Sequence, residues 1–276
     1  MTASEKCRIF RQLHDAGCFV IPNPWDIGSA RFLEGLGFRA LATTSSGIAW
    51  SLGRADNQVP VELALDRIRD IAGAVNVPVN ADFEGGFAAD ADGVYANVSI
   101  GATTGVAGLS IEDSTGSAAN PLFDFDLAVD RVRAARRAID AIGNHVLLTG
   151  RSEGFIAGRP DLAETIRRLV AYAEAGAECL YAPGLRNVAD ISAVVNAVAP
   201  KPVNVLVSAD FTTVADLARI GVRRISVGGA LARAAWKGFV DAAQEIASAG
   251  TFTHLARAIP SSVLESRFTE RTPERS

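Results

Sequence analysis

The chain has 276 residues and a formal net charge of -4, from 27 Lys and Arg against 31 Asp and Glu. Hydrophobic residues make up 49% and charged residues 21%, which is ordinary for a globular protein and argues against disordered and membrane-embedded classes. No basic cluster of the kind that binds nucleic acid is present, so small acidic or neutral ligands remain open.

The sequence carries no targeting or membrane signal. Its first residues, MTASEKCRIF, lack a basic start followed by an apolar run, and no segment reaches about 18 uninterrupted apolar residues. Cys7, Cys18 and Cys179 are an odd number without C-x-x-C spacing, which argues against a disulfide framework and a zinc site. We therefore expect a cytoplasmic protein that contacts no membrane.

Apolar runs and helical patterns alternate along the chain. A first helix is predicted over residues 4–16, where Ile9, Phe10 and Leu13 recur at helical spacing before Gly17. Eight strand candidates follow, at 18–22, 40–44, 77–82, 106–111, 145–149, 179–182, 203–207 and 224–227. Helical patterns separate them, over 26–36, 60–75, 90–101, a segment from Asp124 or Asp126 to Ile142, 160–175, 187–198 and 213–220, and the last covers 230–247.

This alternation predicts an α/β fold, a (β/α)8 TIM-type barrel, which typically needs about 250 residues. A doubly wound sheet would usually carry a glycine fingerprint after its first strand, and NPWDIGSA has none. We expect a single domain over 1–276, with a helix at 4–16, the barrel at about 18–247 and a helical tail at 250–276. The tail is too apolar to stay in water, so we expect it to pack on a neighbouring subunit or on its own barrel.

Polar residues gather where the predicted strands end, which is where such barrels hold their reactive groups. Asp82 and Glu84 stand at alternate positions, so both side chains point the same way, and Gly85 and Gly86 then permit a sharp turn. Like charges this close normally share a proton or a cation. Other candidates are Thr44, Ser45, Ser46, Gly47, Glu112, Asp113, Arg151, Glu153 and Asn204, together with Asp56 in the loop after the second strand.

Carboxylates gathered without histidine or cysteine are typical of a site for a hard cation, Mg²⁺ first and Mn²⁺ second. Arg151 is suited to a substrate carboxylate, and Ser46 with the Gly47 amide to a second anionic end, so a small diacid or phosphonate would fit. Each acid alone could instead cap a helix or pair with an arginine. A turn is the alternative role for Ser45 and Ser46, and a structural tie to a neighbouring loop is the alternative for Asn204.

Four segments, TSSGIA, NADFEGGF, LSIED and GRSEGFIAG, together resemble the isocitrate lyase and phosphoenolpyruvate mutase superfamily, over about residues 20–230. The resemblance implies that Asp82, Glu84 and Glu112 bind Mg²⁺, that Asp56 reaches the metal through water and that Arg151 binds substrate. The stretch that holds the pyruvoyl carboxylate or its neighbour matches Ser46, Gly47 and Ile48. Members stabilise an enolate of a 2-oxo acid and are often tetramers that exchange the last barrel helix, which implies a homo-oligomer, either dimer or tetramer.

The loop after Glu112 departs from that superfamily. Its lyases carry a lysine, cysteine, glycine and histidine run on a mobile loop near this point, and its mutases carry a lysine-rich one. Here the chain reads EDSTGSAANPLFDFD, without cysteine, lysine or histidine. Cleavage of isocitrate or methylisocitrate needs a proton donor to the departing enolate, so this loop argues against it, and phosphonate rearrangement lacks its usual cations.

We therefore predict a Mg²⁺-dependent lyase or decarboxylase that breaks a C–C bond of a small 2-oxo acid such as oxaloacetate, through a metal-stabilised enolate. Mg²⁺ and Arg151 would accept the charge that develops in decarboxylation. Hydrolytic cleavage would need a water oriented by Glu112, Asp113 or Glu153. The alternatives are a mutase or hydrolase of the C–P bond of a phosphonopyruvate, and a protein that binds a 2-oxo acid without catalysis.

Overall fold

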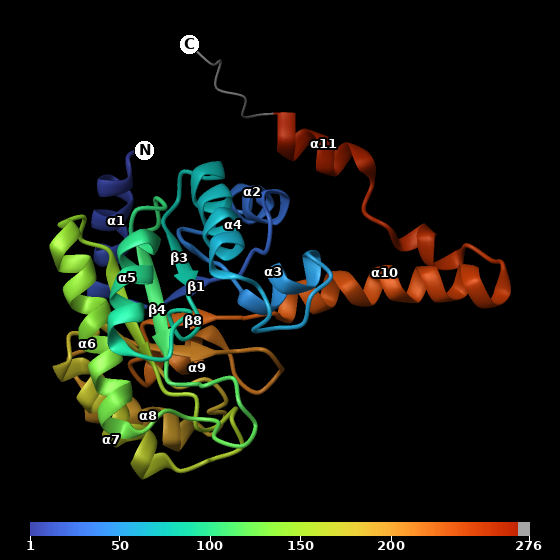
Figure 1. The fold of residues 1–276 in the computed structure, drawn as a ribbon. Helices are drawn as coiled ribbons and strands as arrows, with labels where there is room; N and C mark the ends of the chain where they lie inside the picture. Colours follow the sequence, from blue (N-terminus) through green and yellow to red (C-terminus); the bar gives the residue numbers. More distant parts are fainter. Residues whose placement is uncertain (270–276) are drawn as a thin grey trace.

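Eight parallel strands form one sheet in the computed structural model, which describes residues 1–269 (Figure 1). The strands are β1 (Phe19–Ile21), β2 (Leu41–Ala42), β3 (Val79–Asp82), β4 (Gly108–Glu112), β5 (Leu147–Arg151), β6 (Cys179–Tyr181), β7 (Val203–Leu206) and β8 (Arg224–Ser226). Their order is β1-β8-β7-β6-β5-β4-β3-β2, and the two ends meet where the Ala42 amide donates to the Pro22 carbonyl oxygen at 3.1 Å. The sheet closes into a nearly complete barrel, which confirms the predicted (β/α)8 TIM-type fold.

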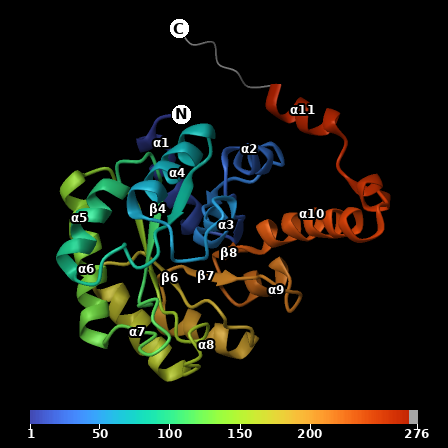
Figure 2. The same cartoon turned by 45° about the vertical axis from the view of Figure 1, so that its right-hand side comes forward.

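Helices alternate with the strands and surround the barrel (Figure 2). They are α1 (Ala3–Asp15), α2 (Ile27–Gly35), α3 (Ser45–Ser51), α4 (Val61–Ala74), α5 (Ala91–Gly101), α6 (Phe125–Ile142), α7 (Leu162–Glu174), α8 (Val188–Val198), α9 (Val214–Arg219), α10 (Ala230–Ala249) and α11 (Ser261–Thr269), with a 3-10 helix over Thr253–Arg257. Side-chain caps begin several of them, as where Asp90 Oδ1 accepts from the Gly93 amide at 2.7 Å. No helix within residues 1–269 is long and apolar enough to cross a membrane.

The structure refines three local predictions. Helix α3 is not predicted from the sequence; it forms because Thr44 Oγ1 caps it and Gly47 leaves room for the close approach of Thr44 and the neighbouring Trp25. A Cβ atom at Gly47 would lie 2.7 Å from Thr44 Cγ2. Strand β5 begins at Leu147 rather than residue 145, because His145 has a left-handed φ of 60°. Asp124 takes the N-cap position of α6, although its side chain makes no capping bond.

The barrel interior is unusually polar. Along β3 to β8 the outward residues, such as Leu109, Leu148 and Ile225, belong to the apolar core between strands and helices. The inward positions of such barrels are usually filled with branched apolar side chains, but here they hold buried Asn80, Ser110, Thr149, Asn204 and Arg224. A polar interior leaves a route for a polar ligand from the carboxyl ends of the strands into the barrel.

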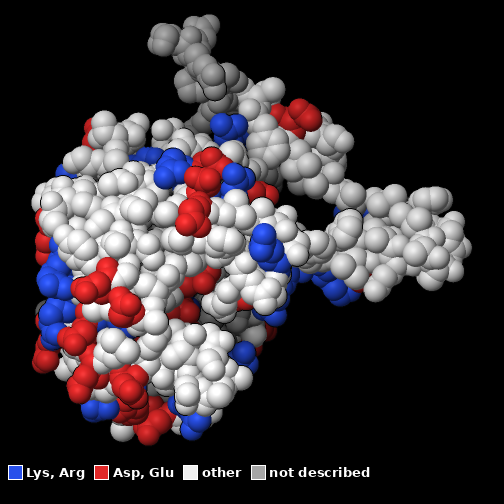
Figure 3. Space-filling view, viewed as in Figure 1, with Lys and Arg blue, Asp and Glu red and all other residues white. Residues whose placement is uncertain are grey.

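Helix α10 leaves the barrel as an arm (Figure 1). Ala232 is the one buried side chain of this 20-residue helix, and Figure 3 shows that most of the arm is uncharged. The chain then returns, and α11 contacts α2 of the same barrel, where Arg267 Nη1 donates to the Gly35 carbonyl oxygen at 3.0 Å. Helix α11 therefore packs on its own barrel, which is one of the two placements expected for the tail. Residues 270–276 of the predicted domain lie outside the described part of the chain.

Candidate active site

Strand β3 delivers Asp82 to the carboxyl end of the barrel and fixes it there. The Asp82 amide donates to Thr43 Oγ1 at 2.9 Å, and Asp82 Oδ2 accepts from the Ser45 amide at 3.1 Å. The loop that follows is strained, because Glu84 and Phe87 have φ values of 46° and 53° although neither is glycine. Such strain is concentrated at functional sites.

Arg131 of α6 stabilises this loop through hydrogen bonds to its backbone. Its side chain is 1% exposed and donates to the carbonyl oxygens of Gly85, Ala88 and Ala89. Burial lowers the pKa of Arg131 to about 10, and its guanidinium carbon lies 3.9 Å from the centroid of the Phe123 ring. Because its terminal nitrogens donate to backbone carbonyl oxygens, Arg131 supports the loop and is not a candidate ligand for substrate.

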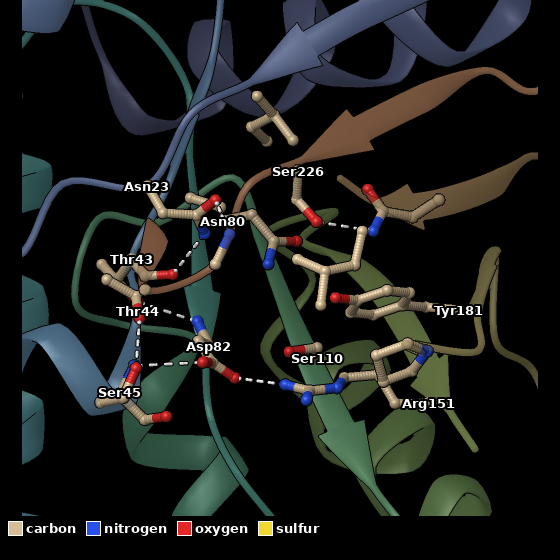
Figure 4. Close-up of a pocket in the computed structure, with 18 of the residues that line it drawn as sticks. Asn23, Thr43, Thr44, Ser45, Asn80, Asp82, Ser110, Arg151, Tyr181 and Ser226 are labelled. Atoms are coloured by element: carbon tan, nitrogen blue, oxygen red, sulfur yellow. Dashed lines mark hydrogen bonds and ion pairs between the residues drawn. The ribbon is translucent and has the colours of Figure 1, made fainter. Parts of the chain in front are cut away.

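Arg151, at the end of β5, draws the predicted acids together. Its guanidinium contacts Asp82 Oδ1 at 2.6 Å, which Figure 4 shows. It also contacts Glu112 Oε2 and Glu153 Oε1, each at 3.0 Å. This convergence follows from the register, because β3, β4 and β5 are neighbours and Glu112 pairs directly with Arg151. Asp56 also approaches, since its carboxyl group interacts with the Ser45 side chain and with the charge of Asp82.

The acids at this site are costly to ionise. Burial, followed by repulsion from Asp82 and Asp56, raises the pKa of Glu84 to about 8. Burial raises the pKa of Glu112 well above its usual range and that of Glu153 to about 7, although Arg151 opposes both shifts. Glu84 differs from the others because its carboxyl group has no hydrogen-bond or ion-pair partner within residues 1–269. A further positive charge would therefore stabilise the site.

Asp113, the remaining candidate acid, has a structural role. Its Oδ1 accepts from the Glu153 amide at 2.7 Å, and its Oδ2 accepts from Arg168 Nη1 at 3.1 Å and from the Tyr172 hydroxyl at 2.6 Å. Both oxygens are thus occupied and the side chain is buried. Asp113 therefore aligns the start of the loop that carries Glu153.

A cavity of about 160 Å³ extends from the strand ends into the barrel, and Figure 3 shows acidic groups in the hollow on this face. Of the predicted site residues, those that line the cavity are Thr44, Ser45, Ser46, Asp56, Asp82, Arg151 and Asn204. Glu84, Glu112 and Glu153 stand beside it and are not part of its lining. Gly47 and Ile48 lie behind Ser46 in α3, where the Gly47 amide donates to Thr44 Oγ1 at 3.4 Å and Ile48 is buried.

The sequence analysis misses much of the polar lining. The missed residues are Asn23, Thr43, Asn80, Ser110, Tyr181, Arg224 and Ser226. Two of them lie on strands two positions before a predicted residue, Asn80 before Asp82 and Ser110 before Glu112, so they point to the same inner face. Reading each strand inward by steps of two would have found them. Asn204 joins this set, because its amide donates to Ser226 Oγ and accepts from Arg224 Nε, each at 2.9 Å.

The donor set fits a hard divalent cation in chemistry and charge. No group of three or more Asp, Glu, His or Cys side chains in the described chain is placed to hold a metal ion as it stands, since Arg151 bridges Asp82 and Glu112. All the available donors are nevertheless carboxylate oxygens, which Mg²⁺ prefers. The carboxyl groups of Asp56, Asp82, Glu84, Glu112 and Glu153 outnumber the single guanidinium among them. A bound cation would take over part of the contact that Asp82 and Glu112 make with Arg151.

Comparison with known proteins places these features in context. A sequence model described as phosphoenolpyruvate phosphomutase matches residues 10–247. An uncharacterized protein of Mycobacterium tuberculosis, Rv1998c, is 30% identical over 263 residues, which are 95% of this chain and 96% of that protein.

Two crystal structures show the same architecture. A protein of Burkholderia cenocepacia that is assigned only provisionally as a lyase/mutase is 44% identical, with a TM-score of 0.93 over 96% of this chain and 97% of that one. The second is 2,3-dimethylmalate lyase, described as a member of the PEP mutase/isocitrate lyase superfamily. It is 25% identical, with a TM-score of 0.82 over 97% of this chain and 91% of that one.

Proposed function

Because the chain belongs to the phosphoenolpyruvate phosphomutase family, within the superfamily that includes isocitrate lyase, we propose that it is a divalent-cation-dependent lyase or decarboxylase that cleaves a C–C bond of a small 2-oxo diacid such as oxaloacetate. Members of the superfamily are lyases and mutases, they include oxaloacetate acetylhydrolase, and they generally use divalent ions such as Mg²⁺. The observation that carries the proposal is the surplus of carboxyl groups around Arg151, with the Glu84 carboxyl group left without a hydrogen-bond or ion-pair partner within the described residues.

The metal ligands in this proposal are Asp82, Glu84 and Glu112, with Asp56 acting through water and Mg²⁺ preferred over Mn²⁺. When bound, the cation withdraws electron density from the 2-oxo oxygen of the substrate. Charge supports this set, because Asp56 and Asp82 each raise the pKa of Glu84 and thus face a common region. A cation at that region removes their mutual repulsion.

The protein groups bind and orient the substrate. Arg151 has five N–H donors, of which its contacts with Asp82, Glu112 and Glu153 use three, and the guanidinium lines the cavity. Its remaining donors suit one substrate carboxylate, and Ser45, Ser46 and Asn204 suit the other end. A cavity of about 160 Å³ admits only a small molecule. In this proposal Glu112 and Glu153 contribute to catalysis by holding Arg151 in place, since neither of them lines the cavity.

A direct assay follows oxaloacetate consumption by loss of the enol absorbance, in Mg²⁺ and in EDTA. We expect turnover that requires Mg²⁺ and falls at least about 10²-fold in Glu84→Gln, because this change removes a charge that holds the cation. Glu174→Gln is the matched control, since Glu174 is exposed and ends α7 at the opposite end of the barrel.

Equal rates in Glu84→Gln and the natural protein would contradict the proposal. Phosphonopyruvate is the second substrate, followed by phosphorus NMR, and phosphorus-containing products with no oxaloacetate turnover would establish the C–P alternative instead. Tight binding of either compound without turnover would establish the binding-protein alternative.

We also propose that α10 makes the protein a homo-oligomer, a dimer or a tetramer. An isolated helix is marginal in water, and this one exposes Trp236 and Phe239, the latter by 63%. The apolar groove beside it, between Trp25, Phe32, Leu231, Ile259 and Phe268, is open and would accept an apolar helix face.

Phe239→Asp is expected to shift the protein toward monomer, because a carboxylate cannot be buried in an apolar interface without a partner. Light scattering coupled to size exclusion measures the mass. Lys237→Asp is the matched control, because its side chain is 74% exposed and forms an ion pair with Asp241 of the same helix. An unchanged mass for Phe239→Asp, or a monomeric natural protein, would contradict the prediction.

A cytoplasmic location is the last part of the proposal. It is supported by the three cysteines, which are free thiols, with Cys7 and Cys179 buried. Free thiols are the common state of cysteine in a reducing compartment.

A further inference from the structure

Tyr181, at the end of β6, points its hydroxyl group into the cavity. Its side chain is 9% exposed and lines the cavity directly. Figure 4 shows the phenol lying between Ser226 and Arg151, with its oxygen directed toward the centre of the pocket. Nothing in the proposed binding of cation and carboxylate uses this group, so its hydroxyl is available for another role.

Its surroundings suit a proton donor. Burial raises the pKa of Tyr181 to about 12, partly offset by Arg151 and by a hydrogen bond with Ser226, so the phenol carries its proton at neutral pH. The guanidinium carbon of Arg151 lies 5.1 Å from the ring centroid, where its positive charge would stabilise a phenolate. The same cation therefore favours the anion that proton donation leaves behind.

A chain of hydrogen bonds orients Ser226 toward the phenol. Arg224 Nε donates to Asn204 Oδ1, and Asn204 Nδ2 donates to Ser226 Oγ, each at 2.9 Å. Because the Ser226 oxygen already accepts from Asn204, its own O–H is free to donate to the Tyr181 oxygen. A donated hydrogen bond favours the phenolate, which agrees with the direction of the Ser226 effect on the pKa of Tyr181.

Among the described residues that line the cavity, Tyr181 is the acid that the proposed cation site leaves over, because the carboxyl groups of Asp56 and Asp82 are assigned to the cation. The residues that line the cavity include no histidine, lysine or cysteine, and the loop from Ser114 to Phe123 contains none either. Serine and threonine hydroxyls are much weaker acids than a phenol. Glu153 lies outside the lining and is held by Arg151 Nε at 3.0 Å. A lyase without a donor would release an enol rather than the ketone.

We propose that Tyr181 is the general acid that protonates the carbon left by C–C cleavage, an inference that rests on the proposed function. As the C–C bond to the departing carboxylate breaks, carbon dioxide leaves and the bond's electron pair forms the C=C bond of an enolate. The enolate then takes the proton of the Tyr181 O–H at carbon, which restores the C=O bond and leaves a phenolate. The phenolate regains its proton from water after the product departs, so the net reaction consumes one proton.

The experiment compares two products of one turnover with oxaloacetate and Mg²⁺. Carbon dioxide release reports bond cleavage, and lactate dehydrogenase with NADH reports pyruvate, because it reduces the keto form. In the natural protein both signals rise together. In Tyr181→Phe we expect kcat to fall about 10²-fold or more, and pyruvate to lag behind carbon dioxide while free enolpyruvate becomes ketone in solution.

Two further variants separate this role from a structural one. Tyr95→Phe is the control on an exposed tyrosine and should behave as the natural protein. Ser226→Ala keeps the phenol but removes its hydrogen bond, and we expect about a tenfold fall in kcat without a change in melting temperature large enough to indicate misfolding. It keeps the inference testable if Tyr181→Phe folds poorly.

The outcomes are distinguishable. If the natural protein turns over oxaloacetate while Tyr181→Phe releases carbon dioxide and pyruvate together at a similar rate, the role of Tyr181 is wrong and the proposed function stands. If Ser226→Ala has the same kcat as the natural protein, the hydrogen-bond chain that ends at Ser226 does not assist Tyr181, and the donor role loses its support. If the natural protein turns over no 2-oxo acid, both the proposed function and this inference fall.

Discussion

Arg151→Met is expected to lower kcat/KM by about 10²–10³-fold, because it removes the donors aimed at the developing charge. It also leaves Asp82, Glu112 and Glu153 without their shared partner in a largely buried site. Breaking a buried ion pair by removal of one member typically costs about 3–5 kcal/mol. We expect this loss of folding stability at pH values above the raised pKa of Glu153. In acid, where the carboxyl groups take up protons, we expect a smaller loss of stability.

Urea unfolding at several pH values measures the stability, and the oxaloacetate assay measures the activity. Arg151→Lys is the informative companion, because it keeps the charge but a single ammonium cannot bridge three carboxylates in the same geometry. We expect it to recover most of the stability and little of the activity. Full activity in Arg151→Lys would contradict the assigned role of the guanidinium, and an unchanged stability of Arg151→Met would contradict its role as the shared counter-ion.

The second large effect is a fall in the stability of the metal-free protein as pH rises. The pKa of Glu84 is about 8 in the folded protein against an ordinary value of 4.5, so the folded state holds this proton more tightly than the unfolded state. The stabilisation is fully present below about pH 4.5, and it is lost as pH rises from there to about 8. Each such group contributes up to about 1.4 kcal/mol per pH unit within its window, and Glu153 adds a window that ends near 7.

Mg²⁺ should oppose this fall, because it binds the ionised carboxylates and leaves the protonated ones. The difference in melting temperature between Mg²⁺ and EDTA is therefore expected to grow with pH and to level off above the pKa of Glu84. In Glu84→Gln we expect a smaller loss of stability with rising pH in the metal-free protein, and a smaller rise in melting temperature on addition of Mg²⁺. A melting temperature that is independent of pH across this window, or a Mg²⁺ effect that is largest in acid, would contradict the account.

The architecture could be predicted from the sequence because each βα unit is patterned locally. Apolar runs such as 179–182 and 203–207 are buried strands that require no long-range information, and Gly176 and Gly221 mark the ends of the helices that precede β6 and β8. Helix α3 was missed because its formation depends on a tertiary contact, the approach of Trp25 to Gly47. The departure of α10 cannot be read from its own apolar pattern, which would suit packing on its own barrel, and it was implied only by the resemblance to a superfamily whose members exchange the last barrel helix.

The candidate site was only partly predictable for a related reason. Residues at strand ends can be found by position alone, which is how Asp82, Glu112 and Arg151 were brought together. Contacts between distant segments cannot be found in this way, so the hydrogen bonds that Arg168 and Tyr172 donate to Asp113 were not predicted. Tyr181 was passed over because a tyrosine in a strand normally indicates core packing, and only the closed barrel places its hydroxyl in the cavity.

Calorimetric titration of Mg²⁺ into the metal-free protein, at a pH above the pKa of Glu84, tests the central claim most directly. The account predicts binding of one ion per chain, accompanied by proton release below that pH, with affinity lost in Glu84→Gln and retained in Glu174→Gln. Absence of binding, or the same affinity in Glu84→Gln as in the natural protein, would show that the carboxyl groups around Arg151 do not hold a cation.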